Sequence, residues 1–461
     1  MKPEPLSTLR RSLRRVILGG TLAMVYSVGI SSPATTDYFR SLGATEFHFG
    51  LIVGVPLLLL SLQFAGAAFV NGATRRKPTF IFCLIACRLL YLPIAFLPGL
   101  TPGLSVNGRI GVVLSLLAAS TALHNFAIPF WFSWMADLVP RRALNRFWGV
   151  RQFWMHGVWT LSYLAATAFL YQVNQPATFT FPILSALAVV AGIADILLFL
   201  RVKEPANLVT SDLRAIDALR APLQHPDFRT FVAFSCWFSF ATMFTAPFLQ
   251  LYILKELGVA PWTTGLIWCG AGIGVMLTSA GWGRLADRHG QRPIINLSVT
   301  GKSMIMIVFL LLTRDNVFWL LPVVFAIDGI FNSANMVACN GYMLSIAPQA
   351  NRSMFIASIT GLSGIVGGVS AMMAGGLFKA IGPGSLEFAG RSWTAYHAVF
   401  AISLLLRWAC IPFARRIREP GSANTSFMLQ EVFGEQPARF LRFPAALYRR
   451  LVPPADRTPE S

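Results

Sequence analysis

Long apolar stretches recur along the whole chain and are separated by short polar segments. A bilayer core is crossed by a helix of roughly 17–25 apolar residues. The stretches do not alternate with period 2 and are longer than barrel strands, so they are predicted to be helices. One such stretch could be a core helix of a soluble protein, but a long series of them indicates an all-α polytopic membrane protein. Twelve spans are predicted, at 16–36, 48–70, 79–98, 110–138, 148–171, 179–200, 230–254, 263–283, 293–313, 317–345, 353–378 and 394–414.

The composition agrees with a membrane protein and changes how the charge is understood. Hydrophobic residues make up 55% of the chain and charged residues 12%, about half of the roughly 25% charged residues of soluble domains. An ordinary soluble enzyme and a disordered chain are therefore excluded. The net charge of +19 would by itself favour a nucleic-acid binder, so the distribution of the basic residues decides what it means.

The basic residues gather on one side of the predicted spans. With the N-terminus in the cytoplasm, 29 of the 38 Lys and Arg residues fall in cytoplasmic segments and 6 on the opposite side. This count includes Arg151, which is placed in the connection between the fourth and fifth spans. The asymmetry follows the positive-inside rule. We therefore predict a multi-pass protein of a plasma membrane of the bacterial inner-membrane type, with both termini cytoplasmic, in contact with membrane lipids and without a nucleic-acid partner.

The two halves of the chain repeat one pattern, which is typical of transporters with a binding site between the halves. The predicted domains are a six-helix bundle over residues 1–202, a cytoplasmic linker over 203–228, a second six-helix bundle over 229–415 and a basic cytoplasmic tail over 416–461. Two pairs of matching tripeptides are each separated by 215 residues: Arg76-Lys77-Pro78 with Gln291-Arg292-Pro293, and Lys203-Glu204-Pro205 with Arg418-Glu419-Pro420.

The connection between the eighth and ninth spans carries a recognisable motif. Residues 281–293 read Gly-Trp-Gly-Arg-Leu-Ala-Asp-Arg-His-Gly-Gln-Arg-Pro, which resembles the Gly-x-Leu-Ala-Asp-Arg-x-Gly-Arg-Arg loop of the major facilitator superfamily (MFS). With the topology and the repeat, the resemblance covers about residues 10–420. It implies a monomeric permease that moves a small solute by alternating access, by facilitated or secondary active transport, with protons as candidate coupling ions. The alternative is a membrane sensor or scaffold of the same fold that transports nothing.

The resemblance also implies a cytoplasmic gate in this loop. Gly283 is expected to allow close backbone approach at a helix end. Asp287 can accept hydrogen bonds from a helix N-terminus or pair with an arginine, and the partner implied by position is Arg352. In the first half Gly72 stands where Asp287 is expected, so we predict that the gating charge is asymmetric. A charged turn that only serves the topology is the competing interpretation. The predicted gate residues are Gly283, Asp287, Arg288, Gly290, Arg292 and Arg352.

A few polar residues inside the spans are candidates for binding the solute or the coupling ion. Ionisable groups are costly in the bilayer and usually face a partner or a cavity. In the family, the fourth and tenth helices line the central cavity, which makes Asp328 and His124 the strongest candidates. For the asparagines, a hydrogen bond between helices is at least as good an interpretation. The candidates are His124, Asn125 and Trp131 in the fourth span, and Asp328, Asn332 and Asn335, which share one helix face, in the tenth.

Other charged residues in the spans are interpreted structurally. Arg88 in the third span and Asp195 in the sixth lie at matching depth, so they are predicted to form an ion pair. Lys302 and Arg407 have no evident acidic neighbour and are expected to extend toward the cytoplasmic headgroups. No catalytic motif, metal-ligand spacing or cofactor-binding loop is recognisable, so we expect no enzymatic activity, metal or cofactor.

Overall fold

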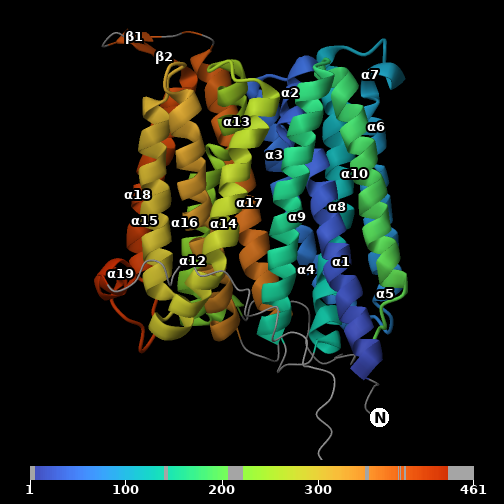
Figure 1. Ribbon diagram of the computed structural model, residues 1–461, viewed down its shortest axis with the longest axis vertical. Coiled ribbons are helices and arrows are strands. Elements are labelled where there is room, and N and C mark those ends of the chain that lie inside the picture. Colours follow the sequence, from blue (N-terminus) through green and yellow to red (C-terminus); the bar gives the residue numbers. More distant parts are fainter. Residues whose placement is uncertain are drawn as a thin grey trace, which may run out of the picture.

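Long helices run side by side through the molecule in a computed structural model that describes residues 6–139, 144–205, 222–347, 352–382, 384, 386–388 and 391–434 (Figure 1). Among these residues, eleven helical segments are long and apolar enough to cross a membrane. The 30-residue helix α9 (Leu144–Val173) is a further long member of the bundle and packs against α1 and α14. The prediction of an all-α polytopic membrane protein is confirmed.

The first half of the chain, residues 6–205, forms the helices of one side of the bundle. Its elements besides α9 are α1 (Leu6–Ser31), α2 (Pro33–Ser41), α3 (Glu46–Leu58), the 3₁₀ turn η1 (Leu59–Ser61), α4 (Leu62–Gly72), α5 (Lys77–Leu89), α6 (Tyr91–Ala95), α7 (Leu97–Leu100), α8 (Val106–Leu138) and α10 (Ala177–Leu200).

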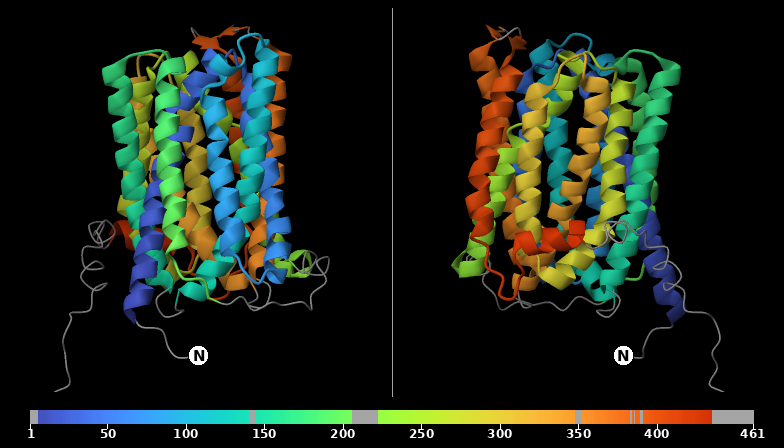
Figure 2. Two further views of the ribbon diagram at one scale, coloured as in Figure 1. Left: turned by 90° about the vertical axis from the view of Figure 1, so that its right-hand side faces the viewer. Right: turned by 60° about the vertical axis from the view of Figure 1, so that its left-hand side comes forward.

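The second half, residues 222–434, forms the other side and ends in a short helix beyond the bundle. Its elements are α12 (Pro226–Met243), α13 (Ala246–Lys255), α14 (Pro261–His289), α15 (Arg292–Leu311), α16 (Val317–Ile346), α17 (Arg352–Ile381), β1 (Leu386–Phe388), β2 (Arg391–Trp393), α18 (Ala395–Arg415) and α19 (Thr425–Gly434). The strands β1 and β2 form an antiparallel hairpin in which Leu386 is opposite Trp393. The hairpin lies at the end of the molecule away from the N-terminus (Figure 2).

The first and seventh predicted spans are each broken into two helices. α1 ends at Ser31 and α2 begins at Pro33, and α12 ends at Met243 while α13 begins at Ala246. Proline occupies one of the first two positions of both α2 and α13, where its missing N–H and fixed φ suit a helix start but cannot continue a preceding helix. The first span of each half is therefore broken after its longer part, which has 26 residues in α1 and 18 in α12.

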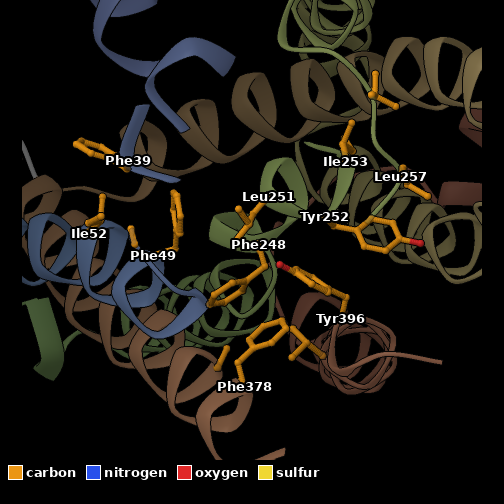
Figure 3. Close-up of a cluster of buried hydrophobic side chains, with 14 of the residues drawn as sticks. Phe39, Phe49, Ile52, Phe248, Leu251, Tyr252, Ile253, Leu257, Phe378 and Tyr396 are labelled. Atoms are coloured by element: carbon orange, nitrogen blue, oxygen red, sulfur yellow. The ribbon is translucent and has the colours of Figure 1, made fainter. Parts of the chain in front are cut away.

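The buried apolar side chains are organised differently at the two ends of the bundle. At the end near α2 and α13, one cluster joins both halves, with Phe39, Phe49 and Ile52 from the first half facing Phe248 and Leu251 from the second (Figure 3). Toward the end that carries the N-terminus, each half has a large cluster of its own: one is built from residues between 16 and 202, the other from residues between 228 and 428. A small cluster of Ala67 from α4 and Met354 from α17 also joins the halves there. One end of the bundle is thus sealed by a shared core.

Glycines bring α3 and α17 together along the boundary between the halves. A Cβ placed on Gly54 would lie 2.9 Å from the backbone oxygen of Gly368, and one on Gly368 would lie 2.6 Å from that of Gly54. One turn away, a Cβ on Gly50 would lie 2.8 Å from the Ala371 oxygen. Small residues of this kind let helix backbones approach closely within a membrane.

The predicted linker and tail lie partly outside the described residues, which omit 206–221 and 435–461. Within the tail, α19 packs against α15, and Met428 of α19 is fully buried. The backbone N–H of Ala423 donates a hydrogen bond of 2.8 Å to the carbonyl oxygen of His289. The first part of the tail is therefore an integral part of the second half.

Candidate solute site and gate

The polar candidates of α16 lie on the face that points into the bundle. Trp319, Val323 and Ile327 form an exposed apolar stripe with a spacing of four residues, as expected for a lipid-facing surface. Asn332 is also exposed, but it is about 140° around the helix from Ile327 at 100° per residue. Asp328, one turn before Asn332, keeps 35% of its side chain exposed. The accessible polar side of α16 therefore faces the interior.

Lys302 of α15 is part of this polar group. Its Nζ lies 3.3 Å from Asp328 Oδ1 and donates a hydrogen bond of 3.2 Å to Asn332 Oδ1. The expectation that Lys302 extends to the headgroups is wrong, because an acid on the neighbouring helix offers a closer partner. Asn335 points instead at α15, where its Nδ2 donates to Ser298 Oγ at 3.2 Å. Asn335 thus links two helices.

Arg407 of α18 is buried next to Lys302, so the expectation that it extends to the membrane surface is also wrong. Its Nη2 donates to Thr245 Oγ1 at 3.3 Å, its Nε to Ser403 Oγ at 3.3 Å, and its Nη1 to the Lys302 carbonyl oxygen at 3.2 Å. Thr245 lies in the break between α12 and α13. Lys302, Asp328 and Arg407 therefore form one charged cluster that spans α15, α16, α18 and the α12–α13 break.

The first half holds a comparable charged cluster. Arg88 Nη2 lies 2.5 Å from Asp195 Oδ2, and both side chains are only 5% exposed. The guanidinium of Arg88 also lies 4.9 Å from the ring centre of Tyr26, within range of a cation–π interaction. A carboxylate between two helices in this setting can hold α5 against α10.

Arg151 belongs to the same region, which corrects its placement in a cytoplasmic connection. Helix α9 begins seven residues before it, so Arg151 is roughly 10 Å inside the helix at 1.5 Å per residue. Its guanidinium lies 4.9 Å from the ring centre of Trp131 and adjoins Gly20 of α1. The preceding residue Gly19 adjoins Asp195, because a Cβ on Gly19 would lie 2.8 Å from Asp195 Oδ1. Trp131 itself is buried and serves as the ring beneath Arg151.

The two polar neighbours of α8 have different surroundings. His124 is exposed and lies half a turn around α8 from Ser115, which is also exposed, so the two side chains point to opposite sides of the helix. Asn125 is 3% exposed and accepts a hydrogen bond of 3.2 Å from Gln63 Nε2. Gln63 Oε1 in turn accepts a hydrogen bond of 2.9 Å from Thr360 Oγ1. Asn125 therefore joins helices at the boundary between the halves.

The predicted gate loop is only partly what its sequence indicates. A Cβ on Gly283 would meet no atom within 4 Å, so its expected role in close backbone approach is wrong. Gly290 ends α14 with a φ of +88°, a conformation that glycine adopts without strain. Asp287 and Arg288 are exposed. The side chain of Arg352 lies outside what the structure describes, and with it the predicted pair of Asp287 and Arg352.

Two glutamates, rather than Asp287, accept the N–H groups at helix starts. Glu419 Oε2 accepts hydrogen bonds from the backbone N of Gln291 at 2.8 Å and of Arg292 at 2.7 Å. In the first half, Glu204 Oε1 accepts them from the backbone N of Arg76 and, at 3.1 Å, of Lys77. A carboxylate at a helix N-terminus satisfies unpaired donors and complements the helix dipole. Glu204 and Glu419 belong to the tripeptides that repeat 215 residues apart, but the sequence alone does not show that they bind these N–H groups.

The first half holds its basic residue at this position differently. Arg76 is fully buried, and its Nη1 lies 2.5 Å from Asp137 Oδ2 and 2.9 Å from Ser133 Oγ. Gly72, which stands at the aligned position of Asp287, adjoins open space. In the first half, the acid that pairs with this arginine is therefore Asp137 at the end of α8, and not a residue at the end of α4.

Polar contacts between the halves reinforce the sealed end of the bundle. Lys255 Nζ lies 2.5 Å from Glu46 Oε1, and the Tyr396 hydroxyl donates to the same oxygen at 2.9 Å. Arg40 Nη1 donates to the Leu254 carbonyl oxygen at 3.4 Å. Each of these contacts joins the two halves, and they surround the shared apolar cluster.

No group of three or more His, Cys, Asp or Glu side chains that could hold a metal ion occurs in the described part of the chain.

The fold, with its sealed end, polar interior and broken first and seventh spans, defines a class of multi-pass transmembrane transporters. A family model, "Major Facilitator Superfamily", matches residues 230–452. The second half of the chain thus matches the model of a family of transporters.

Solved structures share the fold across most of the chain. A mutant of the nucleoside transporter NupG superposes with a TM-score of 0.66 at 11% identity, covering 88% of this chain and 100% of its own. The D-xylose-proton symporter gives 0.62 at 15% identity, covering 89% and 98%. An inward-facing bacterial homologue of the human lysosomal transporter Spinster gives 0.57 at 13% identity, covering 90% and 95%. A search of curated proteins found no match.

Proposed function

We propose that this protein moves a small solute across the membrane by alternating access, through the interior between its two halves. The observation that carries the proposal is the difference between the two ends of the bundle. The end near α2 and α13 is closed by one large apolar cluster built from both halves. Toward the other end each half has a large core of its own, and the halves meet in the small cluster of Ala67 and Met354. A carrier needs such an arrangement, because it opens one side while the other stays closed.

The moving bodies in this proposal are the predicted bundles of residues 1–202 and 229–415. The bias of basic residues supports an orientation with the terminal end in the cytoplasm of a plasma membrane. The structure then corresponds to the state closed toward the outside. The polar interior offers His124, Asp328 and Asn332 to a solute, while Asp287 and Arg352 serve the opposite gate. The driving force is the gradient of the solute or of an ion, with protons the first to be tested.

Side-specific labelling tests this mechanism without knowledge of the substrate. The full-length protein, with its six native cysteines replaced, carries Asn332→Cys and is reconstituted into liposomes of known orientation. A membrane-impermeant thiol reagent is expected to label it from the terminal side and only weakly from the other. Val323→Cys, on the exposed apolar stripe of the same helix, is the matched control and is expected to resist the reagent from both sides.

Transport itself is tested with a solute panel. Solutes that raise the melting temperature of the purified protein are selected, because a ligand stabilises the state that it binds, and their uptake into proteoliposomes is measured with and without a proton gradient. Equal labelling of Asn332→Cys from both sides would contradict alternating access. A solute that binds but never crosses would favour the sensor or scaffold interpretation.

A further inference from the structure

The second half has an open pocket at the end of the molecule that carries the N-terminus. The pocket lies where the start of α12, the start of α15 and the end of α18 come together, and its volume is about 870 Å³, within the range of roughly 300–1,000 Å³ that small-molecule sites occupy. Its described lining is basic. The arginines are Arg229, Arg292, Arg415, Arg416 and Arg418, and the acids are Asp227 and Glu419.

Several of these arginines are available to a ligand. Arg229, Arg415 and Arg418 are exposed, and their side chains form no ion pair or hydrogen bond with another described residue. Glu419 is already engaged, because its Oε2 accepts two backbone N–H groups at the start of α15. The Nε of Arg292 is buried and has no hydrogen-bond partner among the described residues. The pocket therefore offers charged donors to an anion.

Two of the arginines stand where a helix disfavours a cation. Arg229 is the fourth residue of α12, and Arg292 is the first residue of α15. The start of a helix carries the positive end of the helix dipole, which repels a cation and attracts a phosphate. An anion in the pocket would offset this repulsion at both helix starts.

The first half has a basic pocket at the corresponding place, but its cations are used differently. This pocket of about 300 Å³ lies where α1, the start of α5 and the end of α10 meet. Arg15 Nη1 donates to the Arg201 carbonyl oxygen at 2.5 Å, and Lys77 Nζ donates to two carbonyl oxygens beside it at 2.6 and 3.0 Å. In the described lining of the larger pocket, such a bond is made by Arg292 alone, to the Arg415 carbonyl oxygen. Capping of a helix end therefore does not account for the other arginines.

An exposed apolar stripe of α18 leads to the larger pocket, and α18 lies at the outer edge of the bundle (Figure 1). Leu405 and Trp408 are 61% and 42% exposed, and Pro412 is exposed as well. Pro412 and Arg416 each lie within about 20° of Leu405 around the helix, whereas the buried Ala414 lies about 180° away. The distance from Leu405 to Arg416 is roughly 16 Å along the axis, about half of the roughly 30 Å of a bilayer core. The stripe thus has the depth of one leaflet and ends at a cation.

We propose that this pocket binds the phosphate of an anionic phospholipid from the leaflet at the terminal end, with an acyl chain along the apolar stripe of α18. Arginine side chains match a phosphate in charge and in the geometry of their donors. A free phosphate would use the same donors, but a lipid also covers the stripe. The bound lipid joins the start of α12 to the end of α18. The inference holds whichever solute the protein moves, and whether or not it transports one.

Three probes test the inference on the purified full-length protein in detergent. They are phosphatidylglycerol, phosphatidylcholine with the same chains and no net charge, and glycerol 3-phosphate, which has the phosphate and no chains. Binding is measured by native mass spectrometry and by thermal stabilisation. Phosphatidylglycerol is expected to bind and to raise the melting temperature, and the other two are expected to bind at least about tenfold more weakly.

Variants connect the binding to the pocket. Arg229→Gln and Arg418→Gln are each expected to weaken phosphatidylglycerol binding about fivefold, and the double variant about 25-fold, from the usual contribution of one basic residue near an anionic lipid surface. Arg229→Lys keeps the charge and most of the affinity. Arg75→Gln, an exposed position at the same end and outside both pockets, is the matched control and should bind like the unaltered protein. Melting of each variant without lipid shows whether it is folded.

Each outcome decides for or against the site. Weaker phosphatidylglycerol binding in the folded double variant, with no change in Arg75→Gln, would support it. Unchanged binding in the double variant would overturn it, as would an equal loss in Arg75→Gln, because the attraction would then come from the basic surface as a whole. Equal binding of phosphatidylcholine would show that charge is not recognised, and equal binding of glycerol 3-phosphate would assign the pocket to a soluble phosphate; either result would overturn the lipid site.

Discussion

Alanine at Gly368 is expected to disfavour the state in which the end near α2 and α13 is closed. Gly368 of α17 faces Gly54 of α3, and a Cβ there would lie 2.6 Å from the Gly54 backbone oxygen. Ordinary contact begins at 3.4 Å, so the two helices must separate. The obstacle is backbone rather than a flexible side chain, which leaves no cheap way to relieve the clash.

The size of the effect follows from overpacking at a close helix contact. Inserting a methyl group into a well-packed site costs about 1–3 kcal/mol, and the closed state bears this cost because it holds α3 against α17. A coupling of about 1–3 kcal/mol changes a two-state equilibrium by about 5- to 150-fold. We therefore expect Gly368→Ala to increase labelling of Asn332→Cys from the side opposite the termini, with a lower melting temperature.

Gly376→Ala provides the matched control for this prediction. Gly376 lies on the same helix two turns further on, and a Cβ there would meet no atom within 4 Å. Alanine also has a higher helix propensity than glycine, so both variants gain that contribution and only Gly368→Ala adds the clash. If the two variants showed the same labelling and the same melting temperature, the close approach of α3 and α17 would not control access.

Three further predictions concern the ion pairs and the helix cap. Asp195→Asn is expected to destabilise the protein by about 3–5 kcal/mol, because it leaves Arg88 buried beside a neutral group; urea unfolding of the variant in lipid measures this. Glu419→Gln weakens two charge-assisted hydrogen bonds and is expected to cost about 1 kcal/mol, which a lower melting temperature would show. Lys255→Glu places two acids together at the sealed end and should raise labelling from that side, and adding Glu46→Lys should restore the original pattern.

Each of these predictions has an outcome that would contradict it. Asp195→Asn with unchanged stability would mean that Arg88 is already neutralised by other groups. Glu419→Gln with an unchanged melting temperature would show that water replaces the cap without loss. A charge-reversed pair of Glu46→Lys and Lys255→Glu that labels like Lys255→Glu alone would mean that the contact does not hold the sealed end together.

The spans could be read from the sequence because hydrophobic length is a one-dimensional property. The predicted spans correspond to helices of the structure, although α1 begins earlier than expected and the first, second, third and seventh spans each comprise more than one helical element. The length and hydropathy of a helix do not determine how it is rotated about its own axis, and therefore not which neighbours its side chains contact. Lys302 was therefore assigned to the headgroups, whereas its partner Asp328 lies on another helix, 26 positions away in the sequence.

The candidate site was predicted in part, for a similar reason. The helical spacing of Asp328 and Asn332 correctly indicated a common face, but the same spacing also included Asn335, which bonds to Ser298 on α15. Arg151 was placed in a connection, because a polar start of a helix looks like a loop in hydropathy. Such residues are located by their neighbours in space, which a single sequence does not give.

The glutamates that follow α10 and α18 have a mechanical consequence. Glu204 fastens the start of α5 to the end of the first half, and Glu419 fastens the start of α15 to the end of the second. In each half the third span is thereby held to the sixth, and the two cannot drift apart without breaking these bonds. Motion between the states is then expected at the boundary between the halves and at the breaks near Ser32 and Thr245. The short helices α2 and α13 can move there relative to the rest of their half.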